Sequence, residues 1–404
     1  MTRRPLRLPS LRLALHAAAL LAVLWLGGCA TRSSQPQPER TVLSARTTSV
    51  PARIVANYFL VESPQIDGTT RRFLLDTGSS VNYVSEDLAR TLRQRERGAT
   101  KRKTPVRGAN GEEVELEEIT LRRLELGDAA FEHVPALLFD FAELSSHLGL
   151  RVDGLLGFPL FRDTRLTIDY PRAQLTLASP TAPPASDGPG VSTLVFNDEQ
   201  RRPIIPVQIG NESFVVLLDT GSDGSLSLNR AGLHPRFLSG PRPGTIVTSL
   251  GGNRHQQVGR IEQNLQVGDH TVAQPVVDLT DQLSALGGEL LRHFTLTFDQ
   301  RRNLVTFQRA DAGPVHISPR PSTGLAFARS PAYWRVLTVI PDSPSSSLNV
   351  QTGDLVVRIN GEPVARWDYE RYAALLRESA RITYTFLTGT REYEVEVPVF
   401  KLVP

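Results

Sequence analysis

The sequence holds a single cysteine, Cys29, among its 404 residues. No disulfide and no cluster of thiolate metal ligands can therefore form within one chain. A strong charge of one sign is also missing, since 45 basic residues against 42 acidic ones leave a formal net charge of +3. This balance gives no whole-chain field that would attract a nucleic acid, so we expect no DNA or RNA partner.

Several familiar catalytic motifs are absent as well. The sequence contains no HExxH, no GxSxG and no Walker loop, and its eight histidines are scattered. It therefore indicates neither a metal site nor a cofactor. A Ser/His/Asp triad assembled in space has no sequence signal for or against it.

The first 28 residues have the pattern of a signal peptide. Several arginines precede an apolar run at 13–26, which is too short to cross a bilayer comfortably. The run ends in LGGC, and this end resembles the processing box of bacterial lipoproteins, in which cleavage before the cysteine frees it for lipid attachment. The resemblance implies lipidation at Cys29. The alternative is a signal-anchor helix with an incidental cysteine.

Ala30, rather than aspartate, follows this cysteine. In lipoproteins that pattern implies sorting to the outer membrane, with the protein facing the periplasm. The polar residues at 29–51, which include Ser, Gln and Pro, predict a flexible tether.

The rest of the chain contains an internal repeat. RRFLLDTGSS at 71–80 returns as FVVLLDTGSD at 214–223, and two later segments recur in the same order. The later pairs are LELGDAAFEHVPALLFD (124–140) with LQVGDHTVAQPVVDLTD (265–281), and RLTIDYPRAQLTL (165–177) with TLTFDQRRNLVTF (295–307). The repeat is too long for a solenoid unit, so it predicts two homologous lobes. Their predicted bounds are 52–179 and 191–309, with linkers at 180–190 and 310–321 and a third domain at 322–404.

Each lobe consists of short runs of Val, Leu, Ile, Phe and Thr bounded by Gly, Asn, Asp or Pro, which predicts mostly antiparallel β-structure. Asn110-Gly111 is a strong hairpin signal between a basic arm at 100–107 and an acidic arm at 112–119. The two arms would pair their charges across the ladder. The other interpretation of the basic arm is a surface that binds anions.

The repeated Asp-Thr-Gly suggests a specific chemistry. Two carboxyl groups a few Å apart share one proton and so present a base beside an acid, which suffices to hydrolyse a peptide bond with water. Glycine lets the backbone approach the second carboxyl group closely, and the threonine hydroxyl can bond across to the opposing loop. Asp76 and Asp219 are thus each half of a site, and one lobe supplies each half.

From 52 to 309 the sequence resembles the aspartic proteases, and more closely the retropepsin-like unit than the long pepsin lobe. The resemblance implies a mainly β fold, with two retropepsin-like β-barrel lobes that form a pseudo-dimeric acid protease. It implies that Asp76 and Asp219 are catalytic. The supporting loop positions that it implies are Thr77, Gly78, Thr220 and Gly221.

The residues around the two Asp-Thr-Gly triplets match the family pattern less closely than the triplets themselves. In this family two apolar residues and a glycine support each aspartate loop; LLG at 155–157 fits this pattern well and ALG at 285–287 more loosely. Ser79 and Ser222 can donate hydrogen bonds to the dyad and favour its charged form. Asp223 either holds the substrate backbone, as an acid at this place does in retroviral relatives, or caps a turn.

Members of the family also close glycine-rich flaps over the substrate. The candidate in the first lobe is Gly108, Ala109, Asn110 and Gly111, and in the second lobe Gly251 and Gly252. The alternative for both hairpins is an ordinary solvent-exposed turn.

The region 322–404 resembles a PDZ domain, a small α+β module. Gly324, Leu325, Ala326 and Phe327 match the loop that binds a terminal carboxylate, and GDLVVRINGEPV at 353–364 matches the characteristic strand and turn. The resemblance implies binding of C-terminal peptides by strand addition, with the predicted helix at 368–379 beside the groove. The alternative is a degenerate module that only packs on the protease.

These observations together predict a lipid-anchored periplasmic aspartic endopeptidase that acts on peptides or proteins. We expect a monomer, because both half-sites lie in one chain. The alternative from another class is an inactive protease fold that serves as a peptide-binding scaffold in the cell envelope.

Overall fold

The computed structural model describes residues 37–93, 102–108, 111–181, 188–197, 199–249 and 252–404. Residues Pro36–Pro404 form one compact unit. The predicted signal peptide, Cys29 and the start of the predicted tether lie outside the described residues. None of the helices among the described residues has the length and apolar character needed to cross a membrane.

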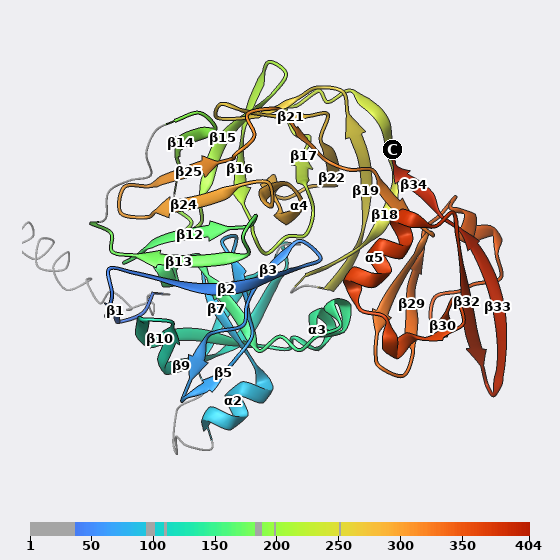
Figure 1. The fold of residues 1–404 in the computed structure, drawn as a ribbon, viewed down its shortest axis with the longest axis horizontal. Helices are drawn as coiled ribbons and strands as arrows, with labels where there is room; N and C mark the ends of the chain where they lie inside the picture. Colours follow the sequence, from blue (N-terminus) through green and yellow to red (C-terminus); the bar gives the residue numbers. More distant parts are fainter. Residues whose placement is uncertain (1–36, 94–101, 109–110, 182–187, 198, 250–251) are drawn as a thin grey trace, which may run out of the picture. The chain divides into compact units, whose positions relative to one another are not determined.

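The first lobe, residues 40–178, is built almost entirely from strands (Figure 1). Its strands are β1 (Arg40–Leu43), β2 (Thr47–Val55), β3 (Tyr58–Val61), β4 (Gln65–Ile66), β5 (Thr69–Thr70), β6 (Phe73–Asp76), β7 (Asn82–Ser85), β8 (Lys103–Arg107), β9 (Glu113–Leu126), β10 (Ala129–Phe139), β11 (Gly154–Gly157), β12 (Arg165–Asp169) and β13 (Gln174–Ala178). Its helices are α2 (Glu86–Arg93), α3 (Ala142–Leu148) and a 3-10 turn at Phe158–Phe161.

The second lobe, residues 191–308, is also built mainly from strands. Its strands are β14 (Val191–Val195), β15 (Ile204–Ile209), β16 (Glu212–Leu218), β17 (Leu226–Asn229), β18 (Phe237–Ser249), β19 (Gly252–Ile261), β20 (Leu265–Val267), β21 (His270–Ala273), β22 (Val276–Thr280), β23 (Ala285–Leu286), β24 (Thr295–Asp299) and β25 (Leu304–Gln308). One short helix, α4 (Gly288–Leu291), follows β23.

The strand pairing shows the duplication directly. In the first lobe β6 runs parallel to β11, which is antiparallel to β7, which is parallel to β10. In the second lobe β16 runs parallel to β23, which is antiparallel to β17, which is parallel to β22. The mainly β fold of two equivalent lobes is therefore confirmed.

The last repeated segments join the two lobes. β12 and β13 form one hairpin, β24 and β25 form the other, and β12 pairs antiparallel with β24. Thr167 lies opposite Thr297 at the centre of this pairing, and their hydroxyl groups are 3.0 Å apart. A continuous sheet thus crosses from one lobe to the other, which fixes the aspartate loops relative to each other.

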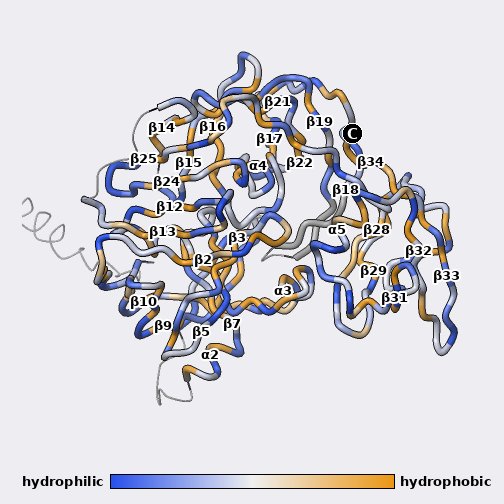
Figure 2. Tube along the Cα trace, in the orientation of Figure 1, coloured by the Kyte–Doolittle hydropathy of each residue, from blue (hydrophilic) through white to orange (hydrophobic). Residues whose placement is uncertain are grey.

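Burial follows the alternation of the strands. Figure 2 shows apolar (orange) and hydrophilic (blue) stretches alternating along the strands of both lobes. Some central strands do not alternate, and in one of them, β6, Phe73, Leu74 and Leu75 are all buried. A strand buried on both faces holds its end rigidly, and this strand ends at Asp76.

Two boundaries predicted from the sequence are wrong. The tether predicted for 29–51 contains β1, which pairs with β10, and most of β2, which pairs with β13. The alternate side chains of Thr48 and Val50 are buried there, so this segment belongs to the lobe. The linker predicted for 310–321 contains β26 (Val315–His316), which pairs with β21, and the start of β27 (Arg320–Ser322). Most of the linker predicted for 180–190 lies outside the described residues.

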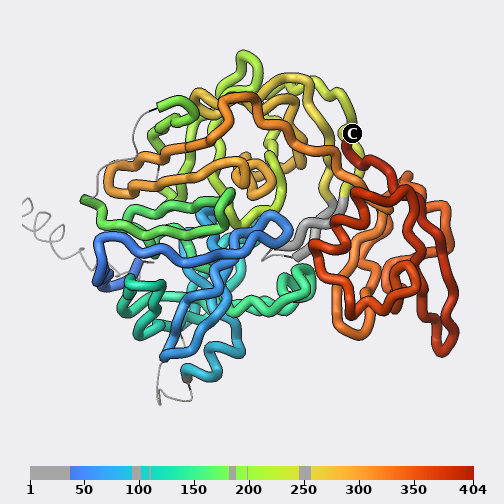
Figure 3. The backbone as a smooth tube through the Cα atoms, viewed as in Figure 1, coloured from blue at the N-terminus to red at the C-terminus, as the bar shows by residue number. Residues whose placement is uncertain are grey.

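The C-terminal module, residues 320–404, has its own sheet and core. Its sheet has the order β28 (Leu325–Arg329), β29 (Trp334–Val339), β30 (Leu355–Ile359), β32 (Arg381–Thr388) and β33 (Arg391–Pro398), with β31 (Glu362–Pro363) beside β30. β34 (Phe400–Val403) pairs with β27, and the helices are α5 (Tyr369–Glu378) and 3-10 turns at Pro344–Ser347 and Val364–Arg366. The path of the module is red in Figure 3.

Aromatic side chains fill the core of the C-terminal module. Phe327, Trp334, Tyr372 and Tyr384 are in mutual ring contact, and the hydroxyl groups of the two tyrosines are 2.6 Å apart. Asp368 caps the start of α5 by accepting a hydrogen bond from the backbone of Arg371. The small α+β fold predicted for this region is confirmed.

Candidate active site

The two aspartates face each other across the lobes. A Cβ atom placed on Gly78 would lie 2.4 Å from Oδ1 of Asp219, and one placed on Gly221 would lie 2.3 Å from Cγ of Asp76. Any side chain at either glycine would therefore displace the opposing carboxyl group. The close approach expected of these two glycines from the sequence is present in the structure.

The two threonines hold the loops together by reciprocal hydrogen bonds. Oγ1 of Thr77 donates to the carbonyl of Leu218 at 2.6 Å and accepts from the backbone N–H of Thr220 at 3.2 Å. Oγ1 of Thr220 donates to the carbonyl of Leu75 at 2.7 Å and accepts from the backbone N–H of Thr77 at 3.0 Å. Both threonines are fully buried, so these bonds cannot be replaced by water. The bonding across the lobes predicted for the threonines is present.

The backbone below each loop is also equivalent. The carbonyl of Ser79 accepts from the N–H of Phe158 at 3.0 Å, and the carbonyl of Ser222 accepts from the N–H of Gly288 at 2.7 Å. The donors directly follow the two segments LLG and ALG. The looser match of ALG in sequence therefore does not change its place in the structure, because this support comes from the backbone.

Burial and proximity divide the pair into an acid and a base. Burial raises the pKa of Asp76 well above its ordinary value, and the charge of Asp219 and the hydrogen bond between the two carboxyl groups raise it further. Burial also raises the pKa of Asp219, but the hydrogen bond from Asp76 and that from the N–H of Gly221, at 2.9 Å, lower it. The two carboxyl groups therefore titrate as a coupled pair that shares one proton, which places an acid beside a base.

Ser79 does not have the role expected of it, whereas the role predicted for Ser222 stays a prediction. Oγ of Ser79 donates to the carbonyl of Val81 at 2.8 Å, two residues further along its own loop. Its hydroxyl hydrogen is thus used in a local turn, and the prediction that it donates to the dyad is wrong. The Ser222 hydroxyl lies beside Gly287, where an added Cβ would be 2.8 Å away.

Asp223 lies among charged groups of the second lobe. Its pKa is raised to about 6, first by burial and then by the charge of Asp278, while Arg320 opposes the shift. The carbonyl of Asp223 accepts a hydrogen bond from Nδ2 of Asn57, on the β2–β3 turn of the first lobe, at 2.9 Å. The two roles considered for the Asp223 side chain, substrate contact and turn cap, stay predictions.

Sequence reasoning missed the cation beside Asp223. Arg320, at the start of β27, binds Asp278 through both terminal nitrogens at 2.8 and 3.1 Å and Glu289 at 2.6 Å. Burial lowers the pKa of Arg320, but the charges of Asp278 and Glu289 outweigh burial and raise it. An arginine in a segment predicted to be a linker gave no signal of this network.

Sequence reasoning also missed Tyr58, the first residue of β3. Burial raises the pKa of Tyr58 well above its ordinary value, and the charges of Asp223, Asp219 and Asp76 raise it further. The ring therefore lies in the field of the dyad. No sequence motif singled out this residue; in the structure it directly follows Ala56 and Asn57, which have positive φ angles.

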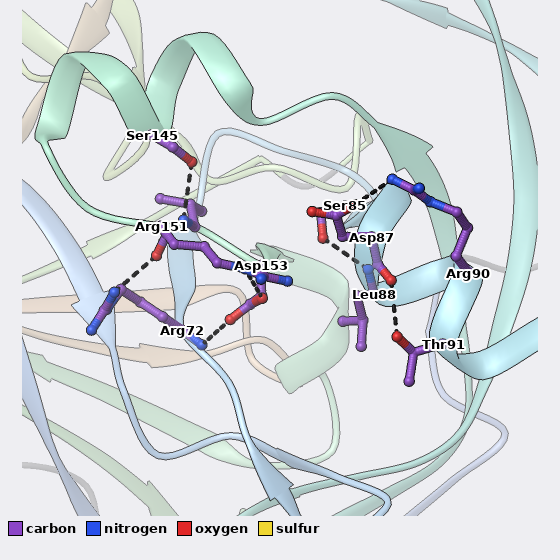
Figure 4. A network of polar contacts seen from close by, with 10 residues as sticks. Arg72, Ser85, Asp87, Leu88, Arg90, Thr91, Ser145, Arg151 and Asp153 are labelled. Carbon is purple, nitrogen blue, oxygen red and sulfur yellow. Dashed lines mark hydrogen bonds and ion pairs between the residues drawn. The ribbon is translucent and has the colours of Figure 1, made fainter. Parts of the chain in front are cut away.

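A further network outside the motif fixes the strands that carry Asp76 (Figure 4). Asp153, directly before β11, accepts from the backbone N–H of Arg72 at 3.0 Å and from Nε of Arg151 at 2.9 Å. Nη1 of Arg72 in turn donates to the carbonyl of Arg151 at 3.0 Å. Oγ of Ser145, on α3, accepts from the N–H of Val152 at 3.1 Å. The starts of β6 and β11 are thereby tied to helix α3.

The predicted first flap is a hairpin with the expected pairing. Lys103 lies opposite Glu117 and Arg107 opposite Glu113, so the basic arm faces the acidic arm. Gly108 and Gly111 close the turn with a backbone hydrogen bond of 2.9 Å, whereas Ala109 and Asn110 lie outside the described residues. A Cβ on Gly111 would be 3.2 Å from the Gln282 side chain, so this turn reaches the second lobe.

The predicted second flap belongs to the long hairpin of β18 and β19. The last described pair is Ser249 with Gly252, and Gly251 lies outside the described residues. Closure of either hairpin over a substrate stays a prediction.

The predicted carboxylate loop of the C-terminal module is mostly strand. Gly324 has a positive φ of 84° and its carbonyl accepts from the N–H of Ile340, but Leu325, Ala326 and Phe327 already belong to β28. The N–H of Gly324 donates to Oγ of Ser322 at 2.9 Å. Leu325 and Phe327 are buried in the core of the module.

No group of three or more His, Cys, Asp or Glu side chains placed to hold a metal ion occurs in the described part of the chain.

Comparison with known proteins identifies two domain types. The family model "Aspartyl protease" matches residues 63–160, and the family model "PDZ domain" matches residues 335–385. No curated protein matches the chain.

Two solved structures are similar in part. A retropepsin-like aspartic protease from Rickettsia conorii is 20% identical with a TM-score of 0.25, over 35% of this chain and 94% of that one. A PDZ domain protein from Parabacteroides distasonis is 17% identical with a TM-score of 0.18, over 20% of each chain. The two family matches confirm what the sequence motifs predicted, namely that this chain combines an aspartyl-protease-like domain with a PDZ domain.

Proposed function

We propose that the protein is an aspartic endopeptidase that hydrolyses peptide bonds with a water molecule activated between Asp76 and Asp219. The observation that carries the proposal is the dyad itself: two half-buried carboxyl groups each lie against the glycine of the opposing loop, and Thr77 and Thr220 fix these loops by reciprocal bonds. An inactive scaffold would not require that geometry.

Because the pair shares one proton, one carboxyl group acts as the base and the other as the acid; the proposal gives these roles to Asp219 and Asp76. Asp219, the base of the pair, takes a proton from water, and the water oxygen forms a bond to the carbonyl carbon of the substrate. Asp76, the acid, gives its proton to the carbonyl oxygen, which yields a neutral tetrahedral gem-diol. In the second step the carbon–nitrogen bond breaks. Asp219 gives its proton to the leaving nitrogen while Asp76 recovers one from a hydroxyl group, so the pair returns to its starting state.

The other parts of the proposal follow the sequence. The two hairpins at 108–111 and 251–252 serve as flaps, and the PDZ domain recognises peptides or protein C-termini. Lipid attachment at Cys29 anchors the chain to the bacterial cell envelope, at the outer membrane and facing the periplasm. The protein acts as a monomer, because β12 and β24 already unite both half-sites in one chain.

The test is cleavage of an unstructured protein by the fragment 30–404, with and without a statine peptide that mimics the transition state. We expect cleavage that the statine peptide abolishes and that a metal chelator and a serine-directed reagent leave unchanged. Binding of the statine peptide without cleavage of any unstructured substrate would instead favour the scaffold. For the anchor, a Cys29→Ser variant of the full chain should no longer partition into the detergent phase.

A further inference from the structure

The PDZ domain contacts both lobes. Oγ of Ser146, on α3 of the first lobe, donates to the carbonyl of Arg329 at the end of β28 at 2.5 Å. Nε of Arg260, on β19 of the second lobe, donates to the carbonyl of Pro404 at 2.5 Å. Arg320 adds its bonds to Asp278 and Glu289. Contacts on two sides hold the module in one orientation on the protease.

That orientation brings the first residue of α5 to the first lobe. Tyr369 packs against an apolar cluster of the first lobe whose buried members include Leu74, Tyr83 and Leu155. Its ring centroid lies 6.0 Å from that of His147 on α3, and the guanidinium group of Arg329 lies over it at 4.8 Å. Glu370, the next residue, lies 4.0 Å from Arg53 on β2. Tyr369 is therefore fixed from several sides.

The cluster that Tyr369 joins runs from the dyad to the first flap hairpin. Leu74 lies two residues before Asp76, and Leu155 lies two residues before Gly157. The partly exposed members Val106 and Leu116 belong to β8 and β9, the two strands of the hairpin. A substrate that enters between the dyad and this hairpin must pass the exposed side of the cluster.

Tyr58 packs against the same cluster, and its neighbour Asn57 donates a hydrogen bond to the carbonyl of Asp223 at 2.9 Å. The charge of Asp223 acts on the side chains of both Tyr369 and Tyr58, and Tyr58 also lies in the field of Asp76 and Asp219. Both tyrosines are only partly buried, so each keeps a surface for a ligand. The PDZ domain thus adds an aromatic side chain to the apolar cluster that includes Leu74 of β6, the strand that ends at Asp76.

We infer that Tyr369 is a specificity-determining residue of the protease, and that with Tyr58 it forms the wall of a subsite for a large apolar substrate side chain. The inference rests on the proposed function. It makes the PDZ domain part of the substrate site as well as a recognition module. The apolar preference follows from the neighbours Val106, Leu116 and Leu155 of the cluster, while the guanidinium group of Arg329 lies over the rings of Trp334 and Tyr369.

The experiment compares Tyr369→Ala and Tyr369→Leu with wild-type protein on short unstructured peptides. The scissile bond is located by mass spectrometry, and Leu is then exchanged for Ala at each of the two positions on either side of it. At one position we expect Tyr369→Ala to reduce the Leu-over-Ala ratio of kcat/KM about tenfold, mainly through KM, because one wall of a hydrophobic pocket is lost. The Leu-over-Ala ratio of Tyr369→Leu should lie between those of wild type and Tyr369→Ala, because leucine keeps apolar packing at this position.

Tyr333→Ala is the matched control, because Tyr333 lies in the same domain and is 42% exposed. Melting temperatures show whether each variant is folded, and Tyr369→Leu carries the test if Tyr369→Ala is not. Leu-over-Ala ratios equal to those of wild type and Tyr333→Ala at all four positions would overturn the inference.

A second measurement separates this inference from the proposed function. Statine peptides with Leu or Ala at the same positions bind without being cleaved, and calorimetry gives their Kd. If wild type binds the Leu peptide more tightly and Tyr369→Ala loses that difference, the subsite stands even for a protein that cleaves nothing. If wild type cleaves peptides but neither measurement distinguishes Tyr369→Ala from Tyr333→Ala, the proposed function stands and the subsite is wrong.

Discussion

Thr77 and Thr220 each donate a hydroxyl hydrogen into the opposite lobe and each accept the other's backbone N–H. The relationship is symmetric although the residues are 143 positions apart. Through these bonds each lobe fixes the position of the other lobe's aspartate loop.

The first prediction concerns these threonines. Thr77→Val leaves the carbonyl of Leu218 and the N–H of Thr220 buried without their partner, at a cost of about 1–3 kcal/mol each. We expect a lower free energy of unfolding in urea and a loss of activity. Thr77→Ser keeps the hydroxyl group and is the control. Equal stability of the Val and Ser variants would contradict the role assigned to these bonds.

The second prediction concerns the glycines of the two loops. Gly78→Ala and Gly221→Ala should each abolish activity, because the new Cβ would lie within 2.4 Å of an opposing carboxyl atom. Gly188→Ala is the matched control, since nothing lies within 4 Å of its Cβ position. Activity is measured as the initial rate of peptide cleavage. An active Gly78→Ala protein would show that the loops are further apart than described here.

The third prediction asks whether one chain contains one site. Asp76→Asn and Asp219→Asn each remove half of the acid–base pair, so each should lose at least about 10²-fold in kcat. Mixing the two variants should restore nothing, and the specific activity of wild type should not fall on dilution, because the two loops are already joined within the chain. Rescue on mixing would indicate that the half-sites exchange between chains.

The fourth prediction concerns stability against pH. The pKa of Asp76 is raised in the folded protein above its ordinary value of 3.8. The folded state then holds a proton that the unfolded state releases, so stability is fully present below that value and is lost as pH rises through the folded pKa. Asn cannot ionise, so Asp76→Asn does not lose this stability as pH rises. Its melting temperature should therefore exceed that of wild type by more at about pH 7 than at about pH 4.

The control for the fourth prediction is Asp163→Asn, which affects a solvent-exposed carboxylate paired with Arg301. Each variant's change in melting temperature relative to wild type is compared between the two pH values. If this change did not depend on pH for Asp76→Asn or for Asp163→Asn, burial of the dyad would have no energetic consequence.

The fifth prediction concerns Arg320. Arg320→Gln leaves Asp278 and Glu289 as close acidic groups without their cation, and breaking such a buried pair costs up to about 3–5 kcal/mol. We expect a destabilised protein in denaturant titrations, and a shift of the acid limb of the pH–rate profile, because Arg320 also opposes the raised pKa of Asp223. Arg301→Gln removes a surface pair and should change neither. An Arg320→Gln protein with the same free energy of unfolding as wild type would mean that the network adds nothing to stability.

The sequence by itself determined the repeat, the mainly β class, the two aspartates and the PDZ domain. These features follow from local patterns, since an apolar strand before Asp-Thr-Gly and a glycine required by close approach are visible in a few adjacent residues. The pairing of the basic and acidic arms in the first hairpin was predictable for the same reason, because Asn110-Gly111 sets the register.

Only the tertiary structure decided which groups lie around the aspartate loops and Asp223. Ser79 follows Asp76 directly, yet its hydroxyl bonds to Val81, because a nearby carbonyl competes for it. Arg320 and Tyr369 come from a segment predicted as a linker and from a separate domain, yet both reach the surroundings of Asp223. Contacts between residues so far apart in the chain depend on how the lobes and the PDZ domain pack, and no short sequence pattern records that packing.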